Sequence, residues 1–278
     1  MQFTTYVKRL IYPLYIYPKI NPKVRRKLHS LFLNYQKKQE KNVSGSGKEM
    51  SLFSNMEEDG IILKILASIS IDKGFFIDIG SNDCINSNCA NLAFNFDWGG
   101  VFIDANEELL KIGKRNYNLF RKGTNLKFVQ STLFPDNINN VICSSSSTVD
   151  IDFMSIDIDG NDYAIWQALE TVRPKIVVIE NKIEYGANDI IVPVLEKFSP
   201  SQWGASILSI TKLAEEKGYT LVATNKEGFN SFYMRNDYLQ LSYLQPLRLE
   251  TVLESESVKK SFYPDSIMHP LLQMLASK

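Results

Sequence analysis

Short apolar segments separated by stretches of helix length dominate the middle of this chain. GFFIDIG, GGVFIDA, LKFVQST, FMSIDID and KIVVIEN are rich in β-branched and aromatic residues. Apolar runs of this length are typical of parallel strands that helices cover on both faces. YTLVATN and GFNSFYMRN follow with too few residues between them for a parallel crossover, so we expect an antiparallel pair. The pattern predicts an α/β fold with a Rossmann-like sheet of seven strands, mostly parallel, the last one antiparallel.

The run SIDIDGND, Ser155 to Asp162, places three carboxylates where the fourth expected strand ends. Ionised carboxylates beside a core are costly unless a partner compensates them. Gly160 permits a tight turn, and a helix is expected to begin directly after it. In open α/β sheets ligands bind outside the carboxyl ends of the strands, so Asp157 and Asp159 are candidate catalytic residues.

FIDIGSND, Phe76 to Asp83, predicts a strand followed by a turn with a single glycine. The segment lacks the G-x-G-x-x-G pattern, which disfavours a dinucleotide. One glycine among acidic and hydroxyl side chains suits a ligand without phosphate that carries an amine, a sulfonium and hydroxyls, and S-adenosylmethionine meets this description. Asp104, at the end of the next apolar run, is placed to accept bonds from both ribose hydroxyls. The predicted donor-binding residues are Asp78, Gly80, Ser81, Asn82, Asp83, Asp104, Ala105, Ser131 and Asp157.

The formal net charge of zero conceals two regions of opposite sign. Residues 1–48 hold 11 of the 31 Lys and Arg residues and 1 of the 31 Asp and Glu residues. Pro13, Pro18 and Pro22 are expected to prevent any long helix before Pro22, from which a helix can start. Its apolar residues then fall on one stripe at spacings of three and four. These residues are Leu28, Leu31, Phe32 and Tyr35.

Two interpretations of this basic arm remain open. Its apolar stripe packs on the main domain with the charges solvated, or it lies on an anionic lipid surface as a peripheral membrane contact. Nucleic acid is not expected as a partner, because the acidic remainder offers no continuing basic track. Three cysteines without metal-ligand spacing and the lack of a signal segment predict a reducing cytoplasm, at the inner face of the membrane if the lipid interpretation holds.

The predicted organisation has three parts. Residues 1–48 form the arm with an SGSG linker at Ser44 to Gly47, residues 49–238 form the main domain, and residues 239–278 form a partly helical extension.

Several of these segments occur in the same order in a known family. EEDGIILKIL, FIDIGSND, GGVFIDAN, FPDNIN, SIDIDGNDYAIWQAL and RPKIVVIE resemble the FkbM-type methyltransferases, and more closely the branch with the SIDIDGND motif. The resemblance covers roughly Met50 to Tyr238. It implies a class I methyltransferase fold, S-adenosylmethionine as donor, and O-methylation of a glycan, nucleotide sugar or lipid-linked saccharide. Cys84 departs from the pattern by replacing a second glycine, and the segment after Glu180 looks shorter than in many relatives.

Two routes would assist deprotonation of an acceptor hydroxyl. Asp157 or Asp159 can act as a general base with a raised pKa. Alternatively, Mg²⁺ is held by oxygen ligands from Asp157, Glu180 and Asn181, which resemble by position the metal set of catechol-type O-methyltransferases. Structural roles are alternatives for three acids: Asp162 at a helix N-terminus, Asp159 within the turn, and Glu180 in an ion pair with a neighbouring lysine.

Two other function classes remain. One is a non-catalytic module that keeps the fold and binds a glycan-assembly partner through the arm. The other is a nucleotide-sugar epimerase or dehydrogenase, which the missing glycine pattern and the absence of a Y-x-x-x-K pair after the fourth strand disfavour.

Overall fold

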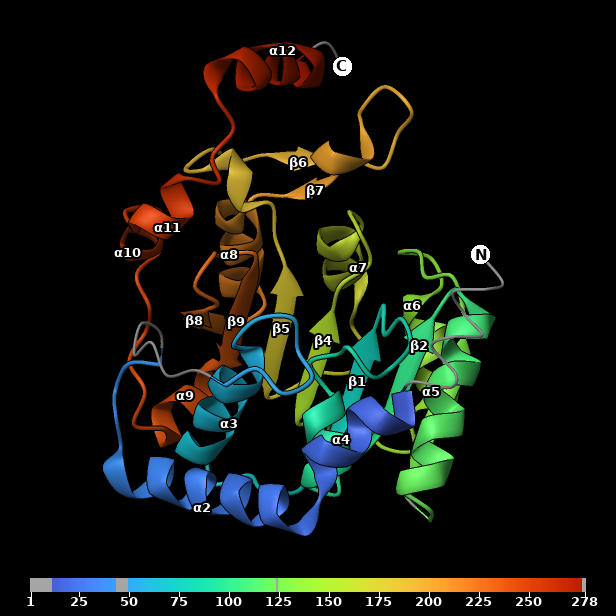
Figure 1. Cartoon of the computed structure of the whole chain (residues 1–278). Helices are drawn as coiled ribbons and strands as arrows, with labels where there is room; N and C mark the ends of the chain where they lie inside the picture. Colours follow the sequence, from blue (N-terminus) through green and yellow to red (C-terminus); the bar gives the residue numbers. More distant parts are fainter. Residues whose placement is uncertain (1–11, 44–49, 124, 277–278) are drawn as a thin grey trace.

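The computed structural model describes residues 12–43, 50–123 and 125–276, and a seven-stranded sheet forms its centre (Figure 1). The strands are β1 (Phe75–Ile79), β2 (Gly99–Asp104), β3 (Leu126–Gln130), β4 (Phe153–Ile156), β5 (Ile176–Glu180), β8 (Tyr219–Thr224) and β9 (Asn230–Arg235). Their order is β3-β2-β1-β4-β5-β9-β8, and β9 runs antiparallel to both of its neighbours while the other pairs are parallel. The predicted sheet is confirmed, and its order is that of the class I methyltransferase fold.

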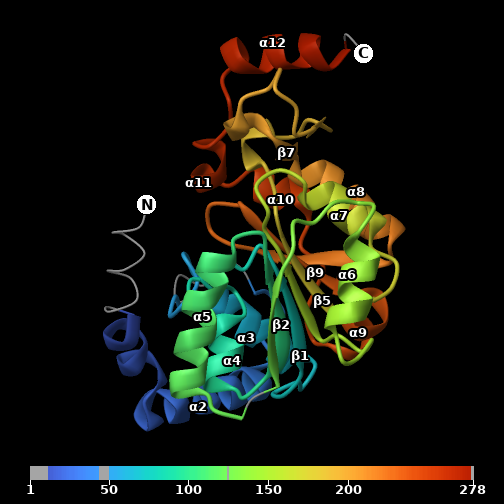
Figure 2. The same cartoon turned by 90° about the vertical axis from the view of Figure 1, so that its right-hand side faces the viewer.

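Helices cover both faces of this sheet. On one face lie α3, α4 and α5, and on the other α6, α7 and α8 (Figure 2). The bounds of the helices are α2 (Pro22–Lys38), α3 (Glu58–Ser68), α4 (Ala90–Asn95), α5 (Glu107–Phe120), α6 (Ile138–Ser145), α7 (Asp162–Ala168), α8 (Ile207–Glu216), α9 (Asn236–Leu241), α10 (Leu249–Leu253), α11 (Glu256–Lys259) and α12 (Asp265–Ala276).

Alternate residues of each strand enter different cores, as the pleat requires. Phe76 of β1 packs with the helices of the first face, whereas its neighbour Ile77 packs with those of the second. Phe102 of β2 and Phe153 of β4 enter the same core as Phe76, and all three are fully buried. Burial on both faces explains why the strands read as continuous apolar runs, and it fixes the loops at their carboxyl ends on a rigid base.

The arm packs on the domain through α2, which crosses the base of the molecule in Figure 1. Leu28 and Phe32 are 2% and 4% exposed and belong to the first core. No long helix is expected before Pro22; residues 12–20 form a helix although they include two prolines, and it is interrupted at Asn21 before α2 begins. A proline removes only its own backbone donor, and burial of Tyr12 and Ile16 compensates for the loss. The predicted linker at residues 44–47 lies outside the described residues.

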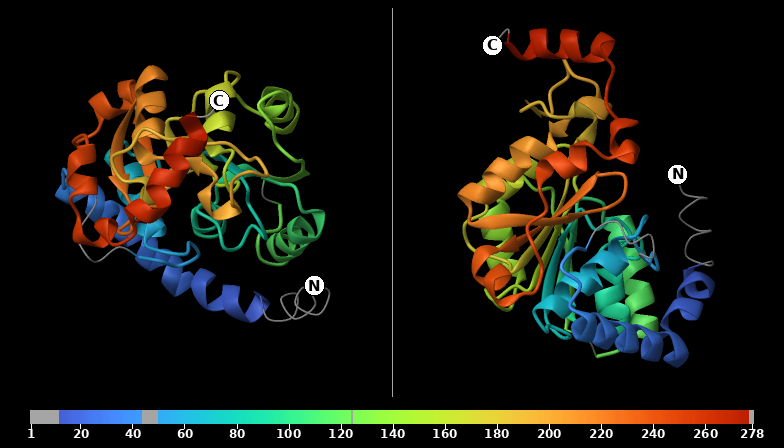
Figure 3. Two further views of the ribbon diagram at one scale, coloured as in Figure 1. Left: turned by 90° about the horizontal axis from the view of Figure 1, so that it is seen from above. Right: turned by 90° about the vertical axis from the view of Figure 1, so that its left-hand side faces the viewer.

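A small third cluster lies beyond the carboxyl ends of the strands. It joins α12 to the antiparallel pair β6 (Ile191–Val192) and β7 (Gly204–Ala205), and to the 3₁₀ turns η1 (Ile183–Tyr185) and η2 (Pro200–Gln202). Figure 3 shows this cap from above and from the side. The cap therefore covers the edge where the sequence places the acidic residues. Among the described residues, no helix is both long and apolar enough to cross a membrane.

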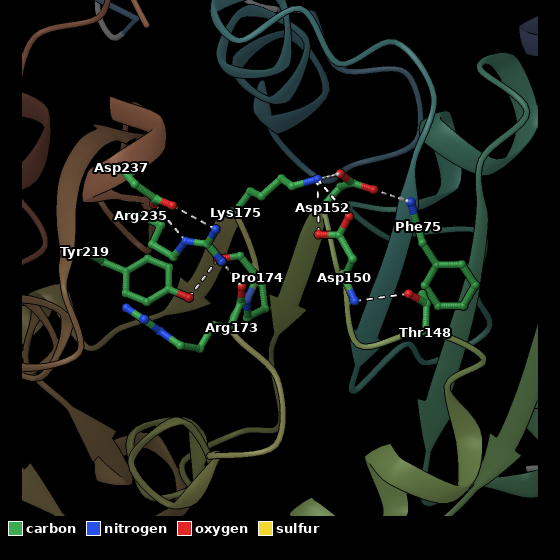
Figure 4. Close-up of polar contacts among 10 residues, drawn as sticks. All are labelled: Phe75, Thr148, Asp150, Asp152, Arg173, Pro174, Lys175, Tyr219, Arg235 and Asp237. Carbon is green, nitrogen blue, oxygen red and sulfur yellow. Dashed lines mark hydrogen bonds and ion pairs between the residues drawn. The ribbon is translucent and has the colours of Figure 1, made fainter. Parts of the chain in front are cut away.

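At the opposite, amino edge of the sheet, carboxylates are paired with cations (Figure 4). The Lys175 Nζ lies 2.5 Å from Asp152 Oδ1 and 3.3 Å from Asp150 Oδ1. Asp152 Oδ2 also accepts a bond of 2.8 Å from the backbone N–H of Phe75. Arg235, at the end of β9, pairs with Asp237 at 2.8 Å. These contacts tie the starts of β1, β4 and β5 together.

We expect Asp152→Asn to lower the free energy of unfolding by about 3 kcal/mol, because it leaves the Lys175 ammonium without its buried partner. Asp150→Asn is the matched control, since that carboxylate is 75% exposed and its loss should cost less than about 1 kcal/mol. Urea denaturation of both variants measures the difference. Equal losses would contradict the importance of burial at this pair.

Candidate active site

Two turns meet at the carboxyl edge of the sheet, one after β1 and one after β4. The N–H groups of Gly80 and Ser81 both donate to the carbonyl of Ile103, at 2.9 and 3.1 Å. Gly80 has a φ of +78°, and a Cβ built on it would lie 1.7 Å from the carbonyl oxygen of Asp157. No residue with a side chain fits there. The glycine is therefore required by the close approach of the acidic turn.

Asp78, from β1, is buried at the carboxyl edge of the sheet. Its Oδ2 accepts a bond of 2.5 Å from the hydroxyl of Ser87. Burial raises the pKa of Asp78 to about 7, even though the hydroxyls of Ser87 and Ser155 favour its ionised form, and the negative charge of Asp104 adds to the rise. A bound cation would favour the charged form of Asp78.

Asp104, at the end of β2, bridges two loops. Its Oδ2 accepts the N–H of Asn82 and its Oδ1 accepts the N–H of Asn106, both at 2.7 Å. The N–H of Ser131 donates to its carbonyl at 2.9 Å, and Ala105 follows it on the surface. Each carboxylate oxygen has a second lone pair, so Asp104 can still accept bonds from ligand hydroxyls. The predicted residues Asn82, Ala105 and Ser131 therefore gather around Asp104.

Asp83 and Ser81 form hydrogen bonds that hold the loop after β1 in shape. Asp83 is 1% exposed and accepts the N–H groups of Ile85 and Asn86, both at 3.1 Å, together with the hydroxyl of Tyr12. Ser81 is buried and its hydroxyl donates to Ile103 at 3.3 Å. Sequence reasoning missed the contact with Tyr12, because no local pattern connects residues 71 positions apart.

Cys84 occupies a backbone conformation that favours glycine. Its φ is +61°. The side chain is fully buried, and a Cβ built on Gly113 of α5 would meet its Sγ at 2.7 Å. Gly113 thus leaves room for the cysteine.

A cleft of about 380 Å³, open to solvent, lies beside these turns. Asp78, Gly80 and Asp157 line it from the strand ends, and Glu58 and Asn230 line it from the start of α3 and of β9. Glu58 Oε1 accepts a bond of 3.0 Å from the side chain of Asn230. Sequence reasoning missed these two residues as site residues, although Glu58 lies in the EEDG motif before α3.

Three carboxylates converge next to the cleft. One ligand oxygen from each of Asp157, Asp162 and Glu180 lies within 4.8 Å of the others. Asp162 closes the acidic turn, since its two oxygens accept the N–H groups of Ile158 at 2.8 Å and Gly160 at 3.0 Å. This acid therefore has the structural role that the sequence analysis set beside a catalytic one.

Loss of hydration and mutual repulsion raise the pKa values in this cluster. Asp157 is open to solvent on one side, but protein surrounds it elsewhere and raises its pKa well above the usual carboxyl range, with further contributions from Glu180 and Asp162. The pKa of Glu180 rises to about 7, mainly through burial. The charge of Lys182 opposes this rise, but no ion pair reaches these acids in the described part of the chain.

The other predicted residues lie around the cluster. Asp159 is exposed, with a φ of +54°, and acts on its neighbours through its charge. Asn181 is buried, and its Nδ2 donates to the carbonyl of Gly228 at 2.8 Å and to the hydroxyl of Ser231 at 2.9 Å. The structure thus brings Asp157 and Glu180 together with Asp162, while the amide nitrogen of Asn181 secures β9 and the loop before it.

No protein-family model matches this chain, and no curated protein sequence matches it. Among solved structures, it is similar to M. capricolum TrmK in complex with S-adenosyl-homocysteine, at 15% identity over 77% of this chain and 83% of the other, with a TM-score of 0.41. It is also similar to a SAM dependent methyltransferase from Aquifex aeolicus, at 14% identity over 62% and 86%, with a TM-score of 0.38. A putative sarcosine dimethylglycine methyltransferase from Galdieria sulphuraria gives 13% identity over 60% and 61%, with a TM-score of 0.43. These distant similarities carry no argument about activity, so the fold class stands on the strand order.

Gly80→Ala and Gly123→Ala form a matched pair. Both glycines have a φ of +78°, but only a Cβ added at Gly80 would have another atom within 4 Å. Both variants should lose about 1 kcal/mol of unfolding free energy through backbone strain. Gly80→Ala should lose about 1 to 3 kcal/mol more, since it displaces the acidic turn. Urea denaturation measures both losses. Similar losses would show that the two turns do not constrain each other.

Proposed function

We propose that the protein is an S-adenosylmethionine-dependent O-methyltransferase that acts on a hydroxyl of a glycan, nucleotide sugar or lipid-linked saccharide. The observation that carries the proposal is the convergence of Asp78, Asp104 and Asp157 at one edge of a class I methyltransferase sheet, with no cation paired to any of them in the described residues. A ligand with a sulfonium and an amine supplies the positive charge that these acids lack. The sequence resemblance to FkbM-type enzymes supports the choice of acceptor class.

The predicted donor residues other than Asp157 divide into three groups in this proposal. Asp104, with Asn82, Ala105 and Ser131 beside it, would receive the ribose and the adenine side of the donor. Asp78 and Gly80 line the cleft and would receive the methionyl side, where a cationic group of the ligand would favour the ionised form of Asp78. Asp83 and Ser81 would act by holding the loop in shape.

Methyl transfer to oxygen is an in-line displacement, and orientation can supply much of the rate enhancement. The C–O bond forms while the C–S bond breaks, the thioether product leaves, and the hydroxyl proton must move to a base. Asp157 would accept this proton, because it borders the cleft and its raised pKa makes it a stronger base than an ordinary carboxylate. Only its ionised fraction can react, so the rate should rise with pH.

A magnesium-assisted route remains the second chemical possibility for the same function. Asp157, Glu180 and Asp162 provide an oxygen-only set of the kind that suits a hard cation. Both Asp162 oxygens already accept backbone N–H groups, so Asp157 and Glu180 would be the principal ligands. A metal held there would lower the pKa of the acceptor hydroxyl.

Calorimetry with S-adenosylmethionine, S-adenosylhomocysteine and NAD tests the donor. We expect the first two to bind and NAD not to bind, and Asp104→Ala should weaken binding of S-adenosylhomocysteine about tenfold or more because it removes the ribose acceptor. Glu107→Ala removes an exposed acid nearby, which pairs with Lys111, and should leave the affinity unchanged. Binding of NAD alone would favour an epimerase or dehydrogenase, and binding of none of the three would favour a non-catalytic module.

Asp157→Asn should reduce turnover at least about a hundredfold because it removes the base, while the affinity for S-adenosylhomocysteine, which carries no sulfonium charge, stays within a few fold. Transfer of labelled methyl groups into a panel of saccharides identifies an acceptor and measures the rate.

In the unmodified protein, activity that EDTA abolishes and Mg²⁺ restores would assign the metal route, and indifference to EDTA would assign Asp157 as the base. Full turnover of the variant would reject both routes.

A further inference from the structure

The helix over residues 12–20 has an apolar side that the described chain leaves in contact with solvent. Tyr12 and Ile16 face the domain and are buried. Leu14 and Tyr17 project from the opposite side of the helix, where they are 75% and 65% exposed. The helix lies on the outside of the molecule, beyond α4 and α5 (Figure 2). Packing on the core therefore accounts for one side of this helix only.

The outer side of α2 is cationic. Leu28 and Phe32 are buried on its inner side, so residues half a turn away face the solvent. Arg26, Leu33 and Lys37 take this outer position and are exposed, Leu33 to 55%. Leu33 follows Arg26 by seven residues and precedes Lys37 by four, so the three share one side of the helix.

Four of the six cations of α2 have no acidic partner among the described residues. Residues 12–39 contain no Asp or Glu. Arg25 pairs with Asp97 at 2.6 Å, and Lys38 pairs with Glu40 at 3.8 Å. The cations without such a pair are Lys23, Arg26, Lys27 and Lys37. Like charges four residues apart on a helix repel one another, so an anionic partner would relieve this repulsion.

We propose that the arm surface, defined as Leu14, Tyr17 and Leu33 together with these four cations, docks on an anionic lipid bilayer. Leucine side chains bury in the acyl boundary, tyrosine lies at the level of the headgroups, and Lys and Arg reach the lipid phosphates. A nucleic acid would neutralise the cations but leave the two leucines in water. A second copy of the chain would place like charges opposite each other.

The arm surface adjoins the cleft of the proposed active site. Asn86 lines the cleft, and its Nδ2 lies 3.3 Å from the hydroxyl of Tyr12, to which it donates. Tyr12 lies on the inner side of a helix that is about 10 to 12 Å across. Docking would therefore bring the mouth of the cleft close to the bilayer, where the saccharide of a lipid-linked acceptor lies. The docking itself does not depend on the proposed function, whereas this use of it does.

Sedimentation of the full chain with phosphatidylcholine vesicles, with and without phosphatidylglycerol, tests the proposal. The anionic vesicles should bind at least about tenfold more tightly, and added salt should weaken the binding. The combined variant Arg26→Gln, Lys27→Gln and Lys37→Gln should weaken it about a hundredfold, at about fivefold for each cation. Its control changes the net charge equally on α8 and after β9, and it should have no effect. The control substitutions are Lys212→Gln, Lys259→Gln and Lys260→Gln.

The apolar part of the arm surface has its own test. Leu14→Ser and Leu33→Ser should each weaken binding to the anionic vesicles about tenfold, because a leucine side chain no longer enters the bilayer. Leu195→Ser is the matched control, since Leu195 is 48% exposed on the cap, at the end of the molecule opposite α2 (Figure 1). It should leave the affinity unchanged.

Equal binding to the two kinds of vesicle, no binding to either, or equal losses in the arm variants and their controls would overturn the proposal. Tighter binding to a mixed-sequence RNA than to anionic vesicles would assign the cations to nucleic acid and overturn it as well. Titration with S-adenosylhomocysteine separates these results from the proposed function, because the arm variants should keep that affinity. Loss of donor binding in the unmodified protein would refute the methyltransferase proposal without affecting the docking.

Discussion

Negative charge that the protein itself does not neutralise is concentrated at one edge of the sheet. At the amino edge, Asp152 is matched by Lys175 in a buried ion pair. At the carboxyl edge, Asp157 and Glu180 lie side by side with no cation bonded to them in the described residues, and their pKa values are raised. Repulsion of this kind lowers the stability of the free protein, and a fold retains it where a ligand supplies the missing charge. The contrast between the two edges is the physical basis for placing the candidate active site at the carboxyl edge of the sheet.

The sheet could be predicted from the sequence because each strand is buried on both faces and therefore carries its own apolar signal. Phe76 and Ile77 illustrate this, since neighbouring residues enter opposite cores. The helix over residues 12–20 could not be predicted, because two prolines oppose it locally and burial of Ile16 in the distant core supports it. Local propensity is a weak guide wherever tertiary packing decides.

Prediction of residue positions succeeded for side chains at the strand ends, and the roles of these residues stay predictions. Asp78, Asp104 and Asp157 all lie at the expected edge. It failed where a side chain is held by partners distant in sequence: Asp83 contacts Tyr12, and Asn230 contacts Glu58. Nothing near these residues in the sequence indicates such pairings.

The bond between Tyr12 and Asp83 makes the basic arm a structural part of the loop after β1 rather than an appendage. Shortened forms of the protein that begin after residue 43 would remove this hydroxyl and strip Leu28 and Phe32 from the core they share with α3. Such forms would be poor substitutes in ligand screening, since a weak signal from them would report damage to the loop. Recombinant work on this chain should keep the arm, and fusion tags are better attached at the other terminus.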